Sequence, residues 1–346
     1  AAILARINDG WVFDNRTGRW SSFGSPAPLA NPKDPGPAGF QIGEVFGLER
    51  EQAYIRAVRR AVELIHAGDA FQVNLTHRLW ASFKGSPRSL FAELSRRLRP
   101  WHAVYLECPA RSSQPGPTAI ASFSPELFLE LTPGGQVTTR PMKGTRPGDA
   151  LVSEFLDAEK DRAELAMIVD LMRNDLGRVC TFGSVDVDSP RQIEHHGKSI
   201  TGKPELVQGV ATISGQLRPG ESVESLLRAT FPPGSITGAP KIRAMQIIDT
   251  IEHALGYDKA LPDRGPYCGS CGYIGDTGSA LLNVAIRTAI ISNNRIDYPV
   301  GAGIVADSDP QSEWNETLDK AKPFLDLAAH HRREAHLCRE TRPGAR

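Results

Sequence analysis

Two short acidic pairs in the sequence could bind a metal ion. Asp161 and Glu164 are three residues apart in one predicted helix, and Glu313 and Glu316 are three apart in another. Side chains at positions i and i+3 project from the same side of a helix. Carboxylates that converge from two helices suit a hard cation such as Mg²⁺, which takes oxygen ligands and keeps water for substrate oxygens. The alternative interpretation is that acids early in a helix complement its dipole.

The segment FPPGSITGAPK at 231–241 could bind an anion. It runs into a predicted helix with Pro240 at the first helical position, and its small and hydroxyl residues leave backbone amides accessible. A helix N-terminus behind such a loop attracts anions through its N–H groups and dipole. The spacing does not fit a Walker A phosphate loop. A tight strand-to-helix turn without a ligand is the other interpretation.

Lys143 and Arg287 are basic residues whose surroundings suggest chemistry. Lys143 stands where a predicted strand breaks at a glycine, so its amine could enter a cleft and act as a nucleophile after losing its proton. A surface lysine in a basic loop is the ordinary alternative. Asn283 and Arg287 are predicted to share one face of a strand. A ligand carboxylate is a natural bidentate partner for Arg287, and a structural salt bridge is the equal alternative.

The composition excludes several classes of protein. The 346 residues include 40 Lys and Arg against 40 Asp and Glu, and a balanced charge gives no electrostatic footprint for nucleic acid or a membrane surface. We expect neither a membrane span nor a signal peptide. Five scattered cysteines favour reduced thiols in a cytoplasmic protein. Cys268 and Cys271 have redox or half-zinc spacing, but no second ligand pair accompanies them, so we favour packing roles.

Local patterns predict an α+β fold. Because strand pairs join through tight turns and helices separate the groups, we expect large antiparallel sheets packed with helices. A short hairpin is expected near the N-terminus, within a segment and linker over 1–48, and a disordered basic tail over 330–346. The predicted helices are 50–67, 153–174, 223–230, 240–251 and 309–329. The predicted strands are 71–79, 103–108, 119–123, 127–131, 137–142, 267–274, 280–291 and 295–305.

Nine blocks of the sequence resemble the chorismate-utilising enzymes. This family includes anthranilate synthase component I, aminodeoxychorismate synthase component I, and the isochorismate and salicylate synthases. The blocks occur in the family's order, and together they are highly specific. The resemblance implies an αβ sandwich with chorismate as substrate and 49–329 as the catalytic domain. The blocks are 68–75, 124–126, 140–145, 161–164, 169–179, 234–241, 268–270, 286–288 and 301–308.

The resemblance also assigns roles to individual residues. It implies that Glu164 and Glu316 hold Mg²⁺, with Asp161 and Glu313 as outer or additional ligands, and that the metal binds the ring carboxylate of chorismate. The histidine at His196 has no assigned role, because the segment after it is one residue shorter than is usual. A further set is expected to bind the substrate and its two carboxylates: Thr145, Ser235, Thr237, Gly238, Tyr267, Arg287, Gly301, Ala302, Gly303 and Lys320.

Lys143 indicates the branch of the family. Members that make anthranilate generally have Ala at this place in the Pro-x-x-Gly-Thr motif, whereas aminodeoxychorismate synthases have Lys. The resemblance implies that this lysine attacks chorismate while Glu126 serves as acid and then base. Gln72 stands where isochorismate and salicylate synthases place a lysine that activates water, which argues against those branches.

We therefore expect aminodeoxychorismate synthase component I, which serves 4-aminobenzoate and folate synthesis. Anthranilate synthase component I and a non-catalytic chorismate-binding paralogue are the alternatives. No glutaminase signature is visible, so the resemblance suggests a separate glutamine amidotransferase subunit as partner. The N-terminal segment is shorter than in full-length relatives, which leaves tryptophan binding open.

Overall fold

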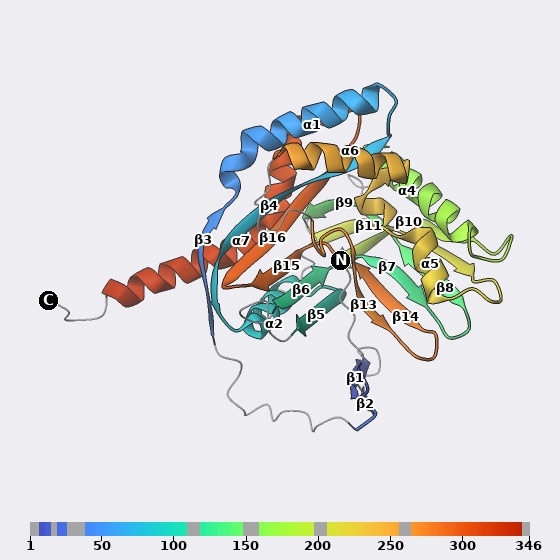
Figure 1. Cartoon of the computed structure of the whole chain (residues 1–346), viewed down its shortest axis with the longest axis horizontal. Coiled ribbons are helices and arrows are strands. Elements are labelled where there is room, and N and C mark those ends of the chain that lie inside the picture. The colour runs from blue at the N-terminus through green and yellow to red at the C-terminus, as the bar shows by residue number, and fades with distance from the viewer. Residues whose placement is uncertain are drawn as a thin grey trace.

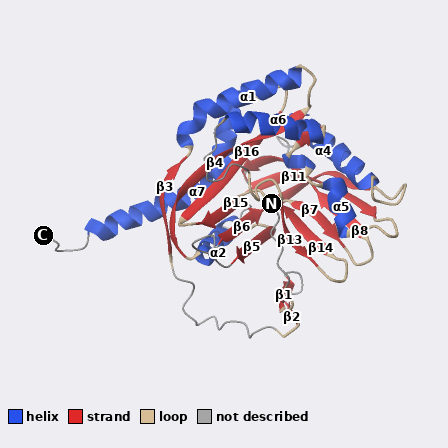
Figure 2. Cartoon of the chain, viewed as in Figure 1, coloured by secondary structure: helices blue, strands red, loops and turns tan. Residues whose placement is uncertain are grey.

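Two antiparallel sheets form the centre of the molecule, and helices lie along their outer sides (Figures 1 and 2). The computed structural model describes residues 7–14, 19–25, 39–108, 118–147, 159–196, 206–255 and 264–340. Every strand pairing within these ranges is antiparallel. The predicted α+β class with large antiparallel sheets is confirmed.

The first sheet has the strand order β10-β11-β8-β7-β14-β13, with β9 also paired to β11. Helices α4 (Glu159–Gly177) and α5 (Val223–Thr230) pack against it. Its strands are β7 (Leu127–Leu131), β8 (Gln136–Arg140), β9 (Met142–Pro147), β10 (Asp186–His196), β11 (Leu206–Gln216), β13 (Ser270–Ile274) and β14 (Ala280–Val284).

The second sheet has the order β12-β4-β16-β15-β6-β5, with β3 also paired to β4. Its outer side is covered by α1 (Glu51–His66), α2 (Pro87–Leu98), α6 (Lys241–Ala254) and α7 (Pro310–Glu340). Its strands are β3 (Phe40–Phe46), β4 (Gln72–Gly85), β5 (His102–Cys108), β6 (Thr118–Ser124), β12 (Gly238–Ala239), β15 (Thr288–Ser292) and β16 (Arg295–Ile304). Two single-turn helices, η1 (Leu48–Arg50) and η2 (Gly234–Ile236), and the hairpin β1 (Gly10–Asp14) with β2 (Arg19–Phe23) complete the described elements.

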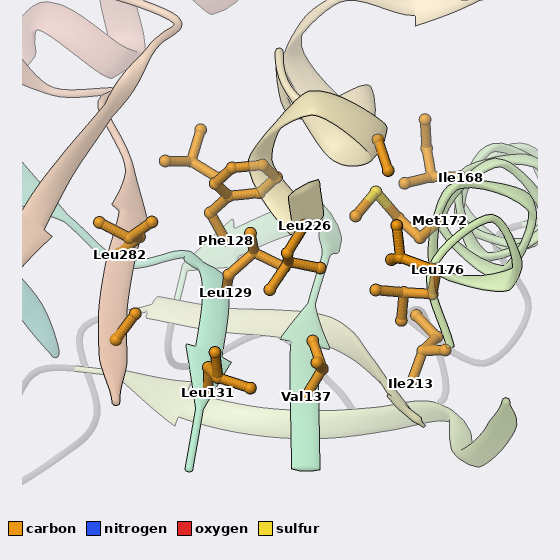
Figure 3. Close-up of a cluster of buried hydrophobic side chains, with 14 of the residues drawn as sticks. Phe128, Leu129, Leu131, Val137, Ile168, Met172, Leu176, Ile213, Leu226 and Leu282 are labelled. Carbon is orange, nitrogen blue, oxygen red and sulfur yellow. The ribbon is translucent and has the colours of Figure 1, made fainter. Parts of the chain in front are cut away.

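Helix α4 shows how sequence periodicity builds the core of the first sheet. Ile168, Met172 and Leu176 recur every four residues, so they lie along one side of the helix. That side faces Val137 and Ile213 on the strands (Figure 3), and all five side chains are buried. This packing fixes α4, and with it the acidic residues Asp161 and Glu164 in its first turns.

Several predicted elements differ from the observed ones in extent. The predicted strand 137–142 is divided into β8 and β9 at Pro141, which has no N–H to donate. Helix α6 begins at Lys241, because Pro240 has extended backbone angles and occupies the cap position. The start of the helix predicted over 153–174 lies outside the described residues. The sequence patterns did not predict β3, α2, β10 and β11.

Helix α7 extends to Glu340, beyond the predicted end at 329. It therefore includes residues 330–340, which the sequence pattern assigned to a disordered tail, while 341–346 lie outside the described residues. The ring of His331 lies 4.5 Å from that of Phe40 on β3. No helix in the described ranges is long and apolar enough to cross a membrane.

The chain crosses between the sheets at two neighbouring places. It passes from β6 to β7 at residues 125–126 and returns from β14 to β15 at 285–287. The crossings are joined by backbone hydrogen bonds, from the Val284 N–H to the Glu126 carbonyl (3.1 Å) and from the Phe123 N–H to the Arg287 carbonyl (3.0 Å). The single strand predicted over 280–291 is therefore wrong: a period-two pattern does not reveal that a strand changes sheets.

Asn283 joins the two sheets. Its Nδ2 donates to the His102 carbonyl (2.7 Å) and to Ser122 Oγ (3.1 Å) in the second sheet, and its Oδ1 accepts from the Cys271 N–H (3.0 Å) in the first. The side chain is 2% exposed. The expectation that Asn283 shares a ligand-binding face with Arg287 is replaced by a structural role.

We predict that Asn283→Ala lowers the free energy of unfolding by about 2 kcal/mol or more, because it leaves a buried N–H and a carbonyl without partners. Urea denaturation measures this loss. Asn315→Ala, at an exposed position on α7, is the control and is expected to change stability by less than about 0.5 kcal/mol. Equal effects of the two substitutions would contradict the bridging role.

Candidate active site

Lys143 reaches from the first sheet to the second. Its Nζ lies 3.2 Å from Glu164 Oε2 on α4 and donates to Gln72 Oε1 on β4 at 3.4 Å. The Lys143 and Glu164 side chains are each 15% exposed. The predicted break at Gly144 is instead a bulge within β9, where the register against β11 shifts and Gly144 has a φ of 72°. Lys143 thus projects from β9, which continues through the bulge as part of the first sheet.

Gly303 on β16 borders the same group of side chains. A Cβ on this residue would lie 3.1 Å from Lys143 Nζ and 3.2 Å from Gln72 Nε2. Gln72 is fully buried, and its Nε2 has no hydrogen-bond partner among the described residues. A buried amide donor without a partner is costly. Its position beside the lysine makes it a candidate contact for a polar ligand.

Glu126 lies at the crossing from β6 to β7 and is 3% exposed. Its Oε1 accepts a hydrogen bond from Ser235 Oγ at 2.6 Å. Burial raises the pKa of Glu126 to about 7, against the opposing effects of the Ser235 hydrogen bond and the positive charge of Lys143. Near neutral pH this carboxyl can therefore either give or take a proton, as a general acid or base requires.

Hydrogen bonds within the loop 231–240, and from this loop to β4, hold the segment that precedes α6. Thr237 Oγ1 donates to the Pro233 carbonyl (2.8 Å), and the Thr237 carbonyl accepts from the Asn74 N–H (3.0 Å). Gly238 has a φ of 131°, and a Cβ there would lie only 2.0 Å from the Gln72 carbonyl oxygen. Of the predicted polar residues in this loop, Ser235 is the one whose hydroxyl contacts a catalytic candidate.

Tyr267 is buried and Arg287 is half-buried, and both lie near the crossings. Arg287 has a φ of 49°, and no carboxylate in the described part of the chain lies within ion-pair distance. Burial lowers the pKa of Arg287 and raises that of Tyr267 well above its usual value. The Tyr267 hydroxyl therefore stays protonated and can donate a hydrogen bond. The Arg287 guanidinium remains available to bind an anionic ligand.

Lys320 on α7 marks another border of the site. Its Nζ lies 2.6 Å from Glu316 Oε1 and donates to the Gly301 carbonyl on β16 at 2.9 Å. Ala302 is completely buried in the outer core, as strand alternation requires, and Gly301 and Gly303 belong to the opposite face. The side chains of Thr145 and His196 lie outside the described residues.

The four predicted metal ligands have different surroundings. Glu164 and Glu316 each face a lysine ammonium. Glu313 is 5% exposed and accepts from Ser308 Oγ at 2.6 Å, which fastens the start of α7. Asp161 lies against Gly144, where a Cβ would come within 2.6 Å of its Oδ2.

Within the described ranges no group of three or more His, Cys, Asp or Glu side chains is placed to hold a metal ion. Mg²⁺ is usually bound by one or two carboxylates together with water and substrate oxygens. Glu164 and Glu316, whose carboxylates each lie beside a lysine ammonium, remain the predicted pair of ligands.

Both the sequence and the fold of the chain are similar to those of known proteins. The family profile described as chorismate binding enzyme matches residues 15–326. The chain belongs to the chorismate-binding enzyme family. Its fold is similar to that of anthranilate synthase component I from Streptococcus pneumoniae, with a TM-score of 0.71 and 29% identity over 90% of this chain and 71% of that one.

Curated relatives of two kinds are similar to the chain at nearly equal identity. Anthranilate synthase component 1 3 of Haloarcula marismortui is 40% identical over 283 residues, which cover 80% of this chain and 52% of that protein. Aminodeoxychorismate synthase component 1 of Escherichia coli is 39% identical over 285 residues, or 80% of this chain and 58% of that protein. The chain thus spans little more than half the length of these relatives.

The sequence indicated neither Asn74 nor the ion pair of Glu252 and Arg264, which lie close to the candidate site. Asn74 lies within the block 68–75 but was given no role, and no motif marks Glu252 and Arg264, because their contacts join distant segments. Cys268 and Cys271 are buried free thiols whose pKa values burial raises to about 11. These thiols remain protonated, which agrees with the packing roles favoured from the sequence.

We predict that Glu126→Gln stabilises the protein selectively at high pH. The folded state binds the Glu126 proton more tightly than the unfolded chain, so ionisation costs stability as pH rises from about 4.5 to about 7, with no further change above. The variant has no such cost, so its advantage over the unsubstituted protein should grow by about 2 kcal/mol between pH 5 and pH 8.

Denaturant titrations at the two pH values measure this difference. Glu130→Gln, on the same strand β7 but exposed, is the control and should have no comparable pH dependence. A parallel response of the two variants would show that Glu126 does not titrate near neutral pH.

Proposed function

We propose that the chain is component I of an aminodeoxychorismate synthase, which converts chorismate and ammonia into 4-amino-4-deoxychorismate and water. The observation that carries the proposal is the placement of Lys143 beside Gln72 and Gly303, and the positive charge of Lys143 also acts on the pKa of the buried acid Glu126. An amine held near a neutral carboxylic acid suits a substitution in which the acid protonates a leaving hydroxyl.

In the first step the Lys143 amine attacks C2 of chorismate, and both ring double bonds shift, to C1=C6 and C4=C5, as the C4 hydroxyl leaves. The C2–N bond forms, the C4–O bond breaks, and Glu126 gives its proton so that the hydroxyl departs as water. Lys143 must first lose its own proton. The nearest carboxylate is that of Glu164, whose Oε2 lies 3.2 Å from Lys143 Nζ. The enzyme then holds the substrate covalently, as nucleophilic catalysis requires.

In the second step ammonia attacks C4, and both ring double bonds shift back, to C5=C6 and C1=C2, as the bond between C2 and the lysine nitrogen breaks. Glu126, now a carboxylate, accepts a proton from the incoming nitrogen, and Lys143 leaves as the amine. Ser235, which donates to Glu126 at 2.6 Å, keeps the carboxyl oriented through both steps. A pKa near 7 suits a group that must act first as acid and then as base.

Positive and hydrogen-bonding groups are proposed to bind the two carboxylates of chorismate. Arg287, which lacks a described carboxylate partner, and the Tyr267 hydroxyl would bind one of them. Lys320 and the backbone of Gly301 and Gly303 would bind near the other. The Gln72 amide would donate to a substrate oxygen beside Lys143, which would supply the partner that its Nε2 lacks.

Mg²⁺ is proposed as the cofactor. Glu164 and Glu316 would hold it, with Asp161 and Glu313 nearby, and the ion would neutralise and orient a substrate carboxylate. A separate glutamine amidotransferase subunit is proposed as the source of ammonia.

Anthranilate synthase component I is the alternative, because relatives of that name are as similar as those named aminodeoxychorismate synthase. Incubation with chorismate, Mg²⁺ and ammonium, followed by product mass with and without an added lyase, separates the two. We expect a product that yields 4-aminobenzoate only when the lyase is present. Direct formation of fluorescent 2-aminobenzoate would support the alternative.

We predict that Lys143→Ala lowers the rate of ammonia-dependent product formation by about 1,000-fold or more, because the nucleophile is removed. Product mass against time measures the rate. The control is Lys322→Ala, at an exposed position on α7, which should retain the full rate. A Lys143→Ala protein that works within about 10-fold of the unsubstituted enzyme would exclude covalent catalysis by this residue.

A further inference from the structure

Strand β4 has a gap along one edge next to the candidate site. On that edge β12 pairs with Gln72 and Val73, and β3 pairs with β4 only from Trp80 onward. The backbone groups between these points need other partners, because an unpaired buried N–H or carbonyl costs free energy. One of them, the Asn74 N–H, donates to the Thr237 carbonyl at 3.0 Å.

The side chains of Glu252 and Arg264 bind two more of these backbone groups. Glu252 Oε1 accepts from the Thr76 N–H at 2.8 Å, and Arg264 Nη2 donates to the Asn74 carbonyl at 2.5 Å. The two side chains also bind each other through two contacts, at 2.5 Å and 2.9 Å. The Glu252 side chain is 8% exposed and that of Arg264 19%. The pair thus takes the place of a neighbouring strand.

Arg264 also begins the turn that carries Tyr267. The far end of this turn is fixed at the crossing between the sheets, where the Cys268 N–H donates to the Ala285 carbonyl (3.0 Å) and the Ala285 N–H to the Gly269 carbonyl (2.9 Å). The near end is fixed to β4 by Arg264, and Cys268 at the far end also binds β4, because Asn74 Nδ2 donates to Cys268 Sγ at 3.6 Å. The turn therefore spans from β4 to the crossing beside Arg287.

We propose that Arg264 and Glu252 are positioning residues that set the affinity of the site for its substrate. They hold the turn of Tyr267 against the stretch of β4 that carries Gln72, so both groups are presented to the same ligand in fixed relation. The inference rests on the proposed function in one respect, namely that chorismate is the ligand whose affinity is measured.

Arg264→Lys tests the proposal, because lysine keeps the charge but not the planar set of donors that reaches Glu252 and Asn74 together. We expect the KM for chorismate to rise about 10-fold or more while kcat changes by less than about 3-fold. Glu252→Gln, which keeps an acceptor for the Thr76 N–H, should have the same effect and serves as a second variant if the first does not fold.

Arg243→Lys is the matched control. Arg243 lies on α6 and binds Asp69, just before β4, at 2.6 Å. It therefore joins α6 to the start of β4, as Glu252 joins α6 to Thr76 on β4, but at a more exposed place. The KM of the Arg243→Lys variant for chorismate should be unchanged. A variant of Arg264 or Glu252 with unchanged KM, whether or not kcat falls through a smaller folded fraction, would overturn the proposal. If the unsubstituted protein does not convert chorismate at all, the proposed function fails instead.

Discussion

The ammonium of Lys143 lies between two sheets where little water reaches it, and protein groups must balance its charge. Burying an unpaired charge costs several kcal/mol, and Glu164 and Gln72 are the groups that meet this one. Glu126 is buried as well, but no described cation lies within ion-pair distance of it, and it receives a hydroxyl from Ser235. Burial therefore affects the two groups differently: Lys143 is paired with a carboxylate, and Glu126 is an acid whose pKa of about 7 lets it give or take a proton near neutral pH.

The path of the chain brings these groups together. Glu126 and Arg287 stand on the two neighbouring crossings between the sheets, and backbone hydrogen bonds join the crossings. Lys143 projects from β9 of one sheet, while Gln72 and Gly303 lie on paired strands of the other. Lys143, Gln72 and Gly303 thus meet on strands, and Glu126 and Arg287 lie on short connections that hydrogen bonds tie together. Rigid supports of this kind suit catalytic groups that must keep a fixed geometry.

Local features of the sequence predicted local structure. Helix α5 matches its prediction at both ends because Ser222 caps it, with reciprocal hydrogen bonds to Ser225, and its apolar residues follow one face. The contact of Ser235 with Glu126, 109 positions apart, could not be predicted in this way. Lys143 was identified by type and by family resemblance, but its contact with Gln72 depends on how two sheets face each other. Asn283 was misplaced for the same reason, since strand alternation does not show which sheet a strand joins.

The central claim is that Lys143 forms a covalent bond with the substrate. The most direct test is to mix the unsubstituted protein with chorismate and Mg²⁺ without ammonia, quench in acid, digest, and measure peptide masses. We expect the peptide containing Lys143 to gain the mass of chorismate less one water, and added ammonia to remove this mass as product forms. An unmodified Lys143 peptide from a preparation that makes product with ammonia would contradict the account.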